Sequence, residues 1–129
     1  MENQKERKNI LVVDDSWISR KYLLTLFELK GYNIYEAANG LEALDILDKN
    51  VPDCIILDVL MPGMNGIELL KAIKERNILV PTIILSADIQ SSTKAQCYRY
   101  GAFSFISKPA PEKEILGKLN QALNKKKVT

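Results

Sequence analysis

Histidine is absent from the 129-residue sequence, and cysteine occurs only twice, at Cys54 and Cys97. The lack of histidine excludes Ser-His-Asp and Cys-His catalysis and most zinc sites. The two cysteines lie far apart without a CxxC spacing, so they predict neither a disulfide nor a metal site. Cys54 falls inside an apolar stretch, where a reduced, buried thiol is the usual outcome. Any chemistry in this chain must therefore depend on other side chains.

Long apolar runs and a strong charge bias are missing as well. No apolar run reaches the ~18 residues of a membrane span, and the opening MENQKERKN lacks the apolar segment of a signal peptide. Lys and Arg number 18 against 16 Asp and Glu, a net charge of +2. The basic clusters at 5–8 and 125–127 are expected to be solvated chain ends. We expect a cytoplasmic protein with no membrane span and no direct contact with nucleic acid.

The length fits one ordinary domain with a substantial core. We expect a single domain over 1–129, with a core of about 8–124 and a basic tail at 125–129. The natural-looking Met1 and the basic tail favour a stand-alone protein, and a part excised from a larger protein is the alternative.

Apolar runs alternate with amphipathic segments five times, which predicts an α/β fold with a parallel sheet. Strands are expected near 9–14, 33–37, 53–58, 82–86 and 103–107, and helices near 16–31, 41–50, 66–76, 91–100 and 111–124. Continuously apolar runs mark the first, third and fourth strands as central. Ser16 is expected to cap the first helix, Asn39-Gly40 to form a turn, and Ser91 or Ser92 to cap the fourth helix.

Polar side chains end four of these strands: Asp14-Asp15, Asp58, Ser86 and Lys108. In an open parallel sheet the carboxyl ends of the strands share one edge, where ligands bind. Neighbouring first and third strands would bring three carboxylates into one small space, where a cation is needed to offset their repulsion. Mg2+ prefers such oxygen ligands. A carboxylate facing a metal-bound phosphoryl donor can also act as a nucleophile and form an acyl phosphate.

Each motif also has a simpler interpretation. Asp14-Asp15 alone is compatible with an acidic pair favoured by a helix dipole. Asp58 or Ser86 alone is compatible with a loop or turn residue, and a Lys108-Pro109 step is common. Only their combination indicates a phosphoryl-acceptor site.

The DD pair, LDVLMPGMNG, LSA and FISKP, in this order and spacing, resemble the receiver domain of two-component response regulators, the CheY-like family. The resemblance covers nearly the whole chain. It implies a flavodoxin-like, doubly wound sheet of five parallel strands in the order 2-1-3-4-5, with five helices. It also implies that Asp58 is phosphorylated, that Asp15 binds Mg2+ or Mn2+ directly and Asp14 through water, and that Asp58 and the carbonyl of Leu60 complete the ligands.

The resemblance further implies that the phosphoryl group contacts the Ser86 hydroxyl, the Ala87 backbone N–H and the Lys108 ammonium. Ser86 and Phe105 then correspond to the switch pair, in which the serine moves and the aromatic ring fills the vacated space. Many relatives have tyrosine where this chain has Phe105, so an output contact through that hydroxyl is lost. Leu60 and Asp88 occupy the two variable positions that tune the phosphoryl lifetime.

The expected function is a phosphorylation-driven signalling switch, not a turnover enzyme, that receives its phosphoryl group from a histidine kinase or phosphotransfer protein. Its output partner is expected at the surface of the last two helices and the last strand, about 91–124, with Lys94, Tyr98 and Tyr100 as candidate contacts. The alternative is a Mg2+-dependent phosphatase with an aspartate nucleophile. Such enzymes carry a second acid two residues after the nucleophile, where this chain has Leu60.

Overall fold

The computed structural model describes residues 7–125, so most of the expected basic tail lies outside the described part of the chain. Five strands alternate with five helices, which confirms the predicted β/α units. In chain order they are β1 (Asn9–Val13), α1 (Trp17–Leu29), β2 (Asn33–Ala37), α2 (Gly40–Lys49), β3 (Cys54–Leu57), α3 (Gly66–Glu75), β4 (Thr82–Ser86), α4 (Ser91–Arg99), β5 (Ser104–Ser107) and α5 (Glu112–Lys125).

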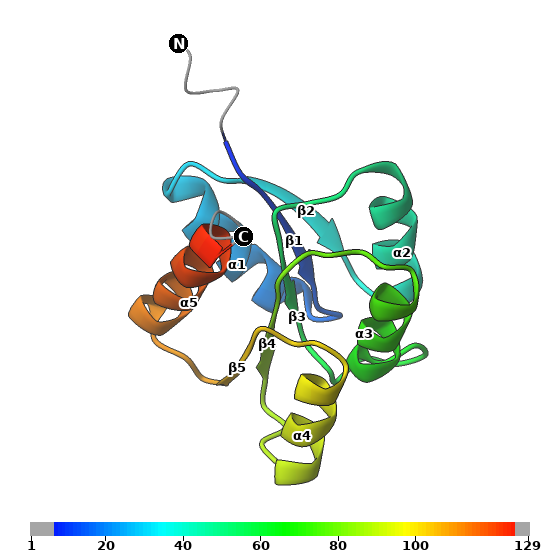
Figure 1. Ribbon diagram of the computed structural model, residues 1–129. Coiled ribbons are helices and arrows are strands. Elements are labelled where there is room, and N and C mark those ends of the chain that lie inside the picture. Colours follow the sequence, from blue (N-terminus) through cyan, green and yellow to red (C-terminus); the bar gives the residue numbers. More distant parts are fainter. Residues whose placement is uncertain (1–6, 126–129) are drawn as a thin grey trace.

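The five strands form one parallel sheet in the order β2-β1-β3-β4-β5, as the resemblance implied (Figure 1). The central strands β1, β3 and β4 are the continuously apolar ones. The more polar β2 lies at an edge, where fewer of its side chains are buried. Since all strands run in the same direction, their carboxyl ends meet at one edge of the sheet.

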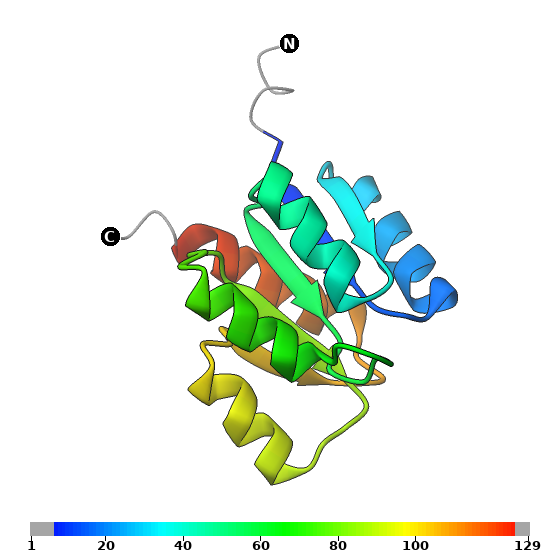
Figure 2. The ribbon, with the colours of Figure 1, turned by 90° about the vertical axis from the view of Figure 1, so that its right-hand side faces the viewer.

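Helices cover both faces of the sheet (Figures 1 and 2). Alternate residues of β1 show how the core divides: Leu11 and Val13 belong to the cluster packed under α2, α3 and α4, and Ile10 and Val12 to the cluster packed under α1 and α5. Successive side chains on a strand point to opposite faces, and with helices on both sides both sets are buried. Cys54 and Cys97 are reduced thiols buried in these clusters, and burial was expected for Cys54.

The helix ends confirm one of the two predicted caps and contradict the other. The Ser16 hydroxyl caps α1 by accepting a hydrogen bond from the Ser19 N–H. Asn39 and Gly40, predicted as the turn after the second strand, lead directly into the helix: Asn39 is the N-cap of α2 and Gly40 is its first residue. A Cβ on Gly40 would lie 2.6 Å from the sulfur of Met64, so a larger residue here would require the flexible Met64 side chain, in the loop after β3, to shift.

The prediction that Ser91 or Ser92 caps α4 is wrong. The N-cap position is Gln90, whose side chain makes no capping hydrogen bond. Asp88 holds this end of the helix instead: its carboxylate accepts the Gln90 N–H at 3.1 Å and the Thr93 hydroxyl at 3.0 Å. The start of α4 is therefore fixed from the loop that follows β4.

None of the helices within residues 7–125 has the length and apolar character needed to cross a membrane.

Candidate functional site

Asp14 and Asp58 lie side by side at the carboxyl edge of the sheet. Val13 on β1 and Leu57 on β3 are register partners. Asp14 and Asp58, which follow them, therefore lie next to each other at the ends of these adjacent strands. The Asp58 N–H donates to the Val13 carbonyl at 3.0 Å, which extends the ladder into the site. Both carboxylates are buried, with relative exposures of 3% for Asp14 and 7% for Asp58. Two buried carboxylates in this position require a compensating positive charge.

Lys108 supplies that charge from the end of β5. Its Nζ donates to Asp14 Oδ2 at 2.9 Å and to Asp58 Oδ2 at 3.1 Å. Its backbone N–H donates to the Ser86 carbonyl at 2.9 Å, and the following bond to Pro109 is cis. Burial alone lowers the pKa of Lys108, but the hydrogen bond to Asp14 and the charge of Asp58 outweigh it, so the pKa is raised. The ammonium is thus firmly protonated between the two carboxylates.

The other oxygen of each carboxylate accepts a backbone N–H two residues further along the chain. Asp14 Oδ1 accepts from Ser16 at 2.9 Å, and Asp58 Oδ1 accepts from Leu60 at 2.9 Å. These local turns are a common use of aspartate at strand ends. Together with Lys108 they hold both side chains in one orientation, which is the preorganisation that a nucleophile or a metal ligand needs.

Asp15 differs from the other two acids because its side chain is exposed. Within residues 7–125 no group of three or more acidic, cysteine or histidine side chains lies close enough together to hold a metal ion. The expected meeting of three carboxylates is therefore not assembled in this structure: Lys108 bridges Asp14 and Asp58, and the exposed Asp15 is not part of this contact. The donors fit Mg2+ in kind, since all are oxygens on neighbouring loops.

Ser86 ends β4 beside the site and is fully buried. Its hydroxyl accepts the Asp88 N–H at 3.2 Å, while Ala87 between them is exposed. Phe105 of β5 is half-buried against the core, and the Nζ of Lys94 on α4 lies 5.4 Å from the centre of its ring. The candidate switch residues Ser86 and Phe105 are therefore both connected to α4, one through Asp88 and the other through Lys94.

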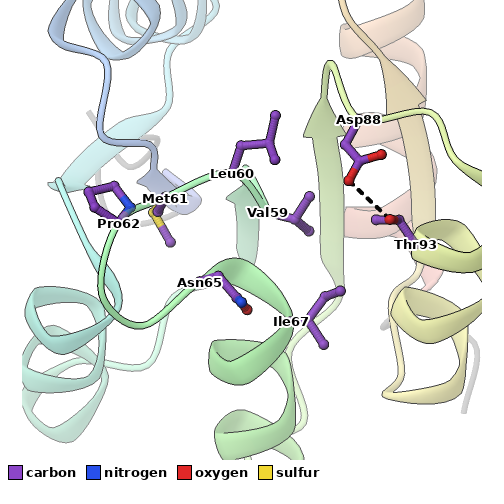
Figure 3. Close-up of a pocket in the computed structure, with 8 residues that line it drawn as sticks. All are labelled: Val59, Leu60, Met61, Pro62, Asn65, Ile67, Asp88 and Thr93. Carbon is purple, nitrogen blue, oxygen red and sulfur yellow. Dashed lines mark hydrogen bonds between the residues drawn. The ribbon is translucent and has the colours of Figure 1, made fainter.

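A pocket of about 400 Å³ opens next to the site, between the loop after β3 and the loop after β4 (Figure 3). The figure shows Leu60 and Val59 on one side and Asp88, bonded to Thr93, on the other. The pocket thus begins at Val59, the residue after Asp58, and its lining includes Leu60 and Asp88. Its full lining is Val59, Leu60, Met61, Pro62, Asn65, Ile67, Asp88 and Thr93.

Sequence reasoning missed two residues that build this site. Gly66 begins α3, and a Cβ there would lie 2.5 Å from the Val59 Cα and 2.6 Å from the Asp58 carbonyl oxygen. Its glycine-rich segment, MPGMNG, was the available signal. Arg20 on α1 donates from Nη1 to the Asp14 carbonyl at 2.8 Å. No local pattern distinguishes it from a solvated helix arginine.

A family model for the response regulator receiver domain matches residues 10–120. The chain is 39% identical over 108 residues to sporulation initiation phosphotransferase F of Bacillus subtilis, covering 84% of this chain and 87% of that protein. Several other curated relatives are longer, and the chain spans only about half of their length, 50% to 52%.

Two solved structures show the same fold. The Vibrio cholerae chemotaxis protein CheY4 is 31% identical with a TM-score of 0.86, over 91% of this chain and 99% of that one. A chain of the CheX-CheY-BeF3-Mg2+ complex from Borrelia burgdorferi is 33% identical with a TM-score of 0.84, over 88% of this chain and 87% of that one. Receiver domains bind Mg2+ for phosphorylation and interact with histidine kinases or phosphotransferases. The family model, the fold and these relatives agree. The chain belongs to the response regulator receiver domain family, whose members are the phosphorylation-activated switches of two-component systems.

Proposed function

We propose that Asp58 is the phosphoryl acceptor of this receiver domain. A carboxylate oxygen of Asp58 attacks phosphorus, the P–N bond to a donor histidine breaks, and an acyl phosphate forms. The observation that supports this most is the position of Asp58: it ends a central strand, is buried, and is held at both oxygens by Leu60 and Lys108. Such a transfer needs position and charge neutralisation rather than a proton shuttle, which fits a chain without histidine.

Mg2+, or Mn2+ in its place, is proposed to bind to Asp15 directly, to Asp14 through water, to Asp58 and to the Leu60 carbonyl. The bound cation supplies positive charge that draws a phosphoryl donor to Asp58. Lys108 already carries a charge between Asp14 and Asp58. With the metal neutralising these acids, the ammonium is free to contact a phosphoryl oxygen.

The remaining phosphoryl contacts are proposed to come from the Ser86 hydroxyl and the Ala87 N–H. The Ser86 hydroxyl now accepts from the Asp88 N–H. A serine that turns to donate to the phosphoryl group changes its geometry at Asp88, and Phe105 is then proposed to move toward the vacated space. This links the chemistry at Asp58 to the start of α4.

The donor is proposed to be a histidine kinase or phosphotransfer protein, and the output partner to bind at α4, β5 and α5, with Lys94, Tyr98 and Tyr100 as candidate contacts. We propose a switch rather than a turnover enzyme. A phosphatase with an aspartate nucleophile needs a second acid, whereas Val59 and Leu60 follow Asp58. Several relatives are about twice as long. We therefore also propose, as the alternative, that this receiver domain is part of a larger regulator.

Trp17 offers a direct test because it follows the acidic pair closely and its side chain is 63% exposed. Mg2+ is expected to quench its fluorescence, and beryllofluoride added with Mg2+ to change it further. In Asp58→Asn the beryllofluoride response is expected to disappear. If the folded wild-type protein shows no saturable fluorescence response to either addition, the proposed function is wrong.

A further inference from the structure

Arg20 is a partly buried arginine that connects the acidic pair to a neighbouring strand. Its side chain, on the first turns of α1, is only 14% exposed. Nη1 donates to the Asp14 carbonyl oxygen at 2.8 Å, and Nε donates to Glu36 Oε1 on β2 at 3.1 Å. One guanidinium therefore ties the end of β1 to the end of β2, in the forked geometry that arginine allows and lysine does not.

With Arg20 in place, every polar group of Asp14 is bound. The Asp14 N–H donates to the Ala37 carbonyl at 3.1 Å, and its two carboxylate oxygens accept from Ser16 and Lys108. The carbonyl that Arg20 holds belongs to the peptide group joining Asp14 to Asp15. Because a peptide group is planar, holding this carbonyl oxygen also fixes the orientation of the N–H and Cα of Asp15, which lie in the same plane.

We infer that Arg20 is a positioning residue for Asp15, which sets the direction of this exposed carboxylate toward the divalent cation. The inference rests on the proposed function, in which Asp15 is a direct metal ligand. Arg20 is not itself a ligand. It acts on the metal through the backbone, as hydrogen-bonded partners of metal ligands commonly do.

The charge of Arg20 makes the inference testable, because charge and positioning have opposite consequences. A cation near the site repels Mg2+, so removing the charge alone strengthens binding. Loss of the hydrogen bond that holds the Asp14–Asp15 peptide group, by contrast, weakens Mg2+ binding. Glu36 offsets part of the guanidinium charge through their ion pair, which favours the positioning role.

Calorimetric Mg2+ titrations of the full chain distinguish these effects without depending on phosphorylation. Arg20→Met and Arg20→Lys are expected to bind Mg2+ about tenfold more weakly, the usual effect of removing a hydrogen-bonded partner of a ligand. Arg20→Lys keeps the charge and serves as the second variant where Arg20→Met does not fold, as checked by circular dichroism. Lys21→Met removes an exposed cation from the same helix and is the matched control, expected to leave affinity unchanged or slightly higher.

Glu36→Gln leaves the bond from Arg20 to Asp14 in place but removes the anion that orients the guanidinium, so a smaller loss is expected. Wild-type affinity in folded Arg20→Lys, or tighter binding in folded Arg20→Met, would overturn the positioning role. Absence of Mg2+ binding in the wild-type protein would instead overturn the proposed function, so the two failures are distinct.

Discussion

The ammonium of Lys108 lies 2.9 Å from Asp14 Oδ2 and 3.1 Å from Asp58 Oδ2, although the three residues come from three different strand ends. This contact joins β5 to β1 and β3 across the carboxyl edge of the sheet. It bridges two buried carboxylate side chains and places a positive charge between them. The site thus holds a cation of its own, beside which the proposed Mg2+ would bind.

Lys108→Met leaves two buried carboxylates without their positive partner. We expect the free energy of unfolding without Mg2+ to fall by about 1–3 kcal/mol at neutral pH, less than for a fully buried pair because Lys108 is 25% exposed. Mg2+ should stabilise this variant more than the wild type, because the metal then replaces the missing charge. Urea denaturation with and without Mg2+ measures both effects.

Lys113→Met, which removes an exposed lysine of α5, is the control and is expected to change stability by less than about 0.5 kcal/mol. Equal stabilisation by Mg2+ in wild type and Lys108→Met would contradict the role of Lys108 as the charge partner of both acids.

Gly66→Ala places a Cβ against backbone atoms of Asp58 and Val59, which cannot move as a flexible side chain can. We expect a loss of stability of about 2 kcal/mol or more, and weaker Mg2+ binding because the end of β3 shifts. Thermal unfolding and Mg2+ titration test this. The matched variant is Gly117→Ala in α5, where a Cβ meets open space and stabilisation by about 0.5–1 kcal/mol is expected. Similar results for the two alanines would refute this explanation.

Ser104 has the one buried side-chain polar atom without a hydrogen-bond partner in the part of the chain that the structure describes. Replacing it by alanine removes a desolvated hydroxyl, so Ser104→Ala is expected to be neutral or to stabilise by about 1 kcal/mol. Thr82→Val is the comparison, because the equally buried Thr82 hydroxyl donates to the Val80 carbonyl at 3.3 Å. Chemical denaturation should show a loss for Thr82→Val; a clear loss for Ser104→Ala would mean that its hydroxyl is satisfied.

The stability of the protein is expected to fall with rising pH above about 9. Burial, with a contribution from Asp88, raises the pKa of the Cys97 thiol from 9.0 to about 11. Between these values the unfolded chain has lost a proton that the folded chain keeps, so stability falls by up to about 1.4 kcal/mol per pH unit. The raised pKa of Lys108 acts in the same direction above its ordinary 10.5. Cys97→Ala should flatten the decline between pH 9 and 11, and an unchanged slope would contradict this assignment.

The sequence was sufficient to predict the strands, their order through the family resemblance, and the polar groups at the carboxyl edge. Apolar runs that end in Asp14, Asp58, Ser86 and Lys108 are local patterns, and the geometry of a parallel sheet brings strand ends together whatever the loops do. The burial of Cys54 was predicted for the same reason, since it follows from the apolar strand that contains this residue.

Contacts between distant segments could not be read in this way. Whether Lys108 or a metal neutralises the acids depends on side-chain placement across three strands. The role of Arg20 depends on how α1 packs beside β2. The cap of α4 was misassigned because Ser91 and Ser92 are good local caps, whereas Asp88 in the preceding loop holds the helix start through the Gln90 N–H and the Thr93 hydroxyl.

The most direct test of the central claim is to locate the acyl phosphate. The protein is incubated with Mg2+ and a phosphorylated phosphotransfer protein or acetyl phosphate, then reduced with borohydride, which converts a phosphorylated aspartate to homoserine, and mapped by peptide mass spectrometry. Homoserine at position 58 in the wild type, absent without Mg2+ and in Asp58→Asn, is the predicted result. Homoserine at Asp14 or Asp15 instead, or none in folded wild-type protein with either donor, would contradict it.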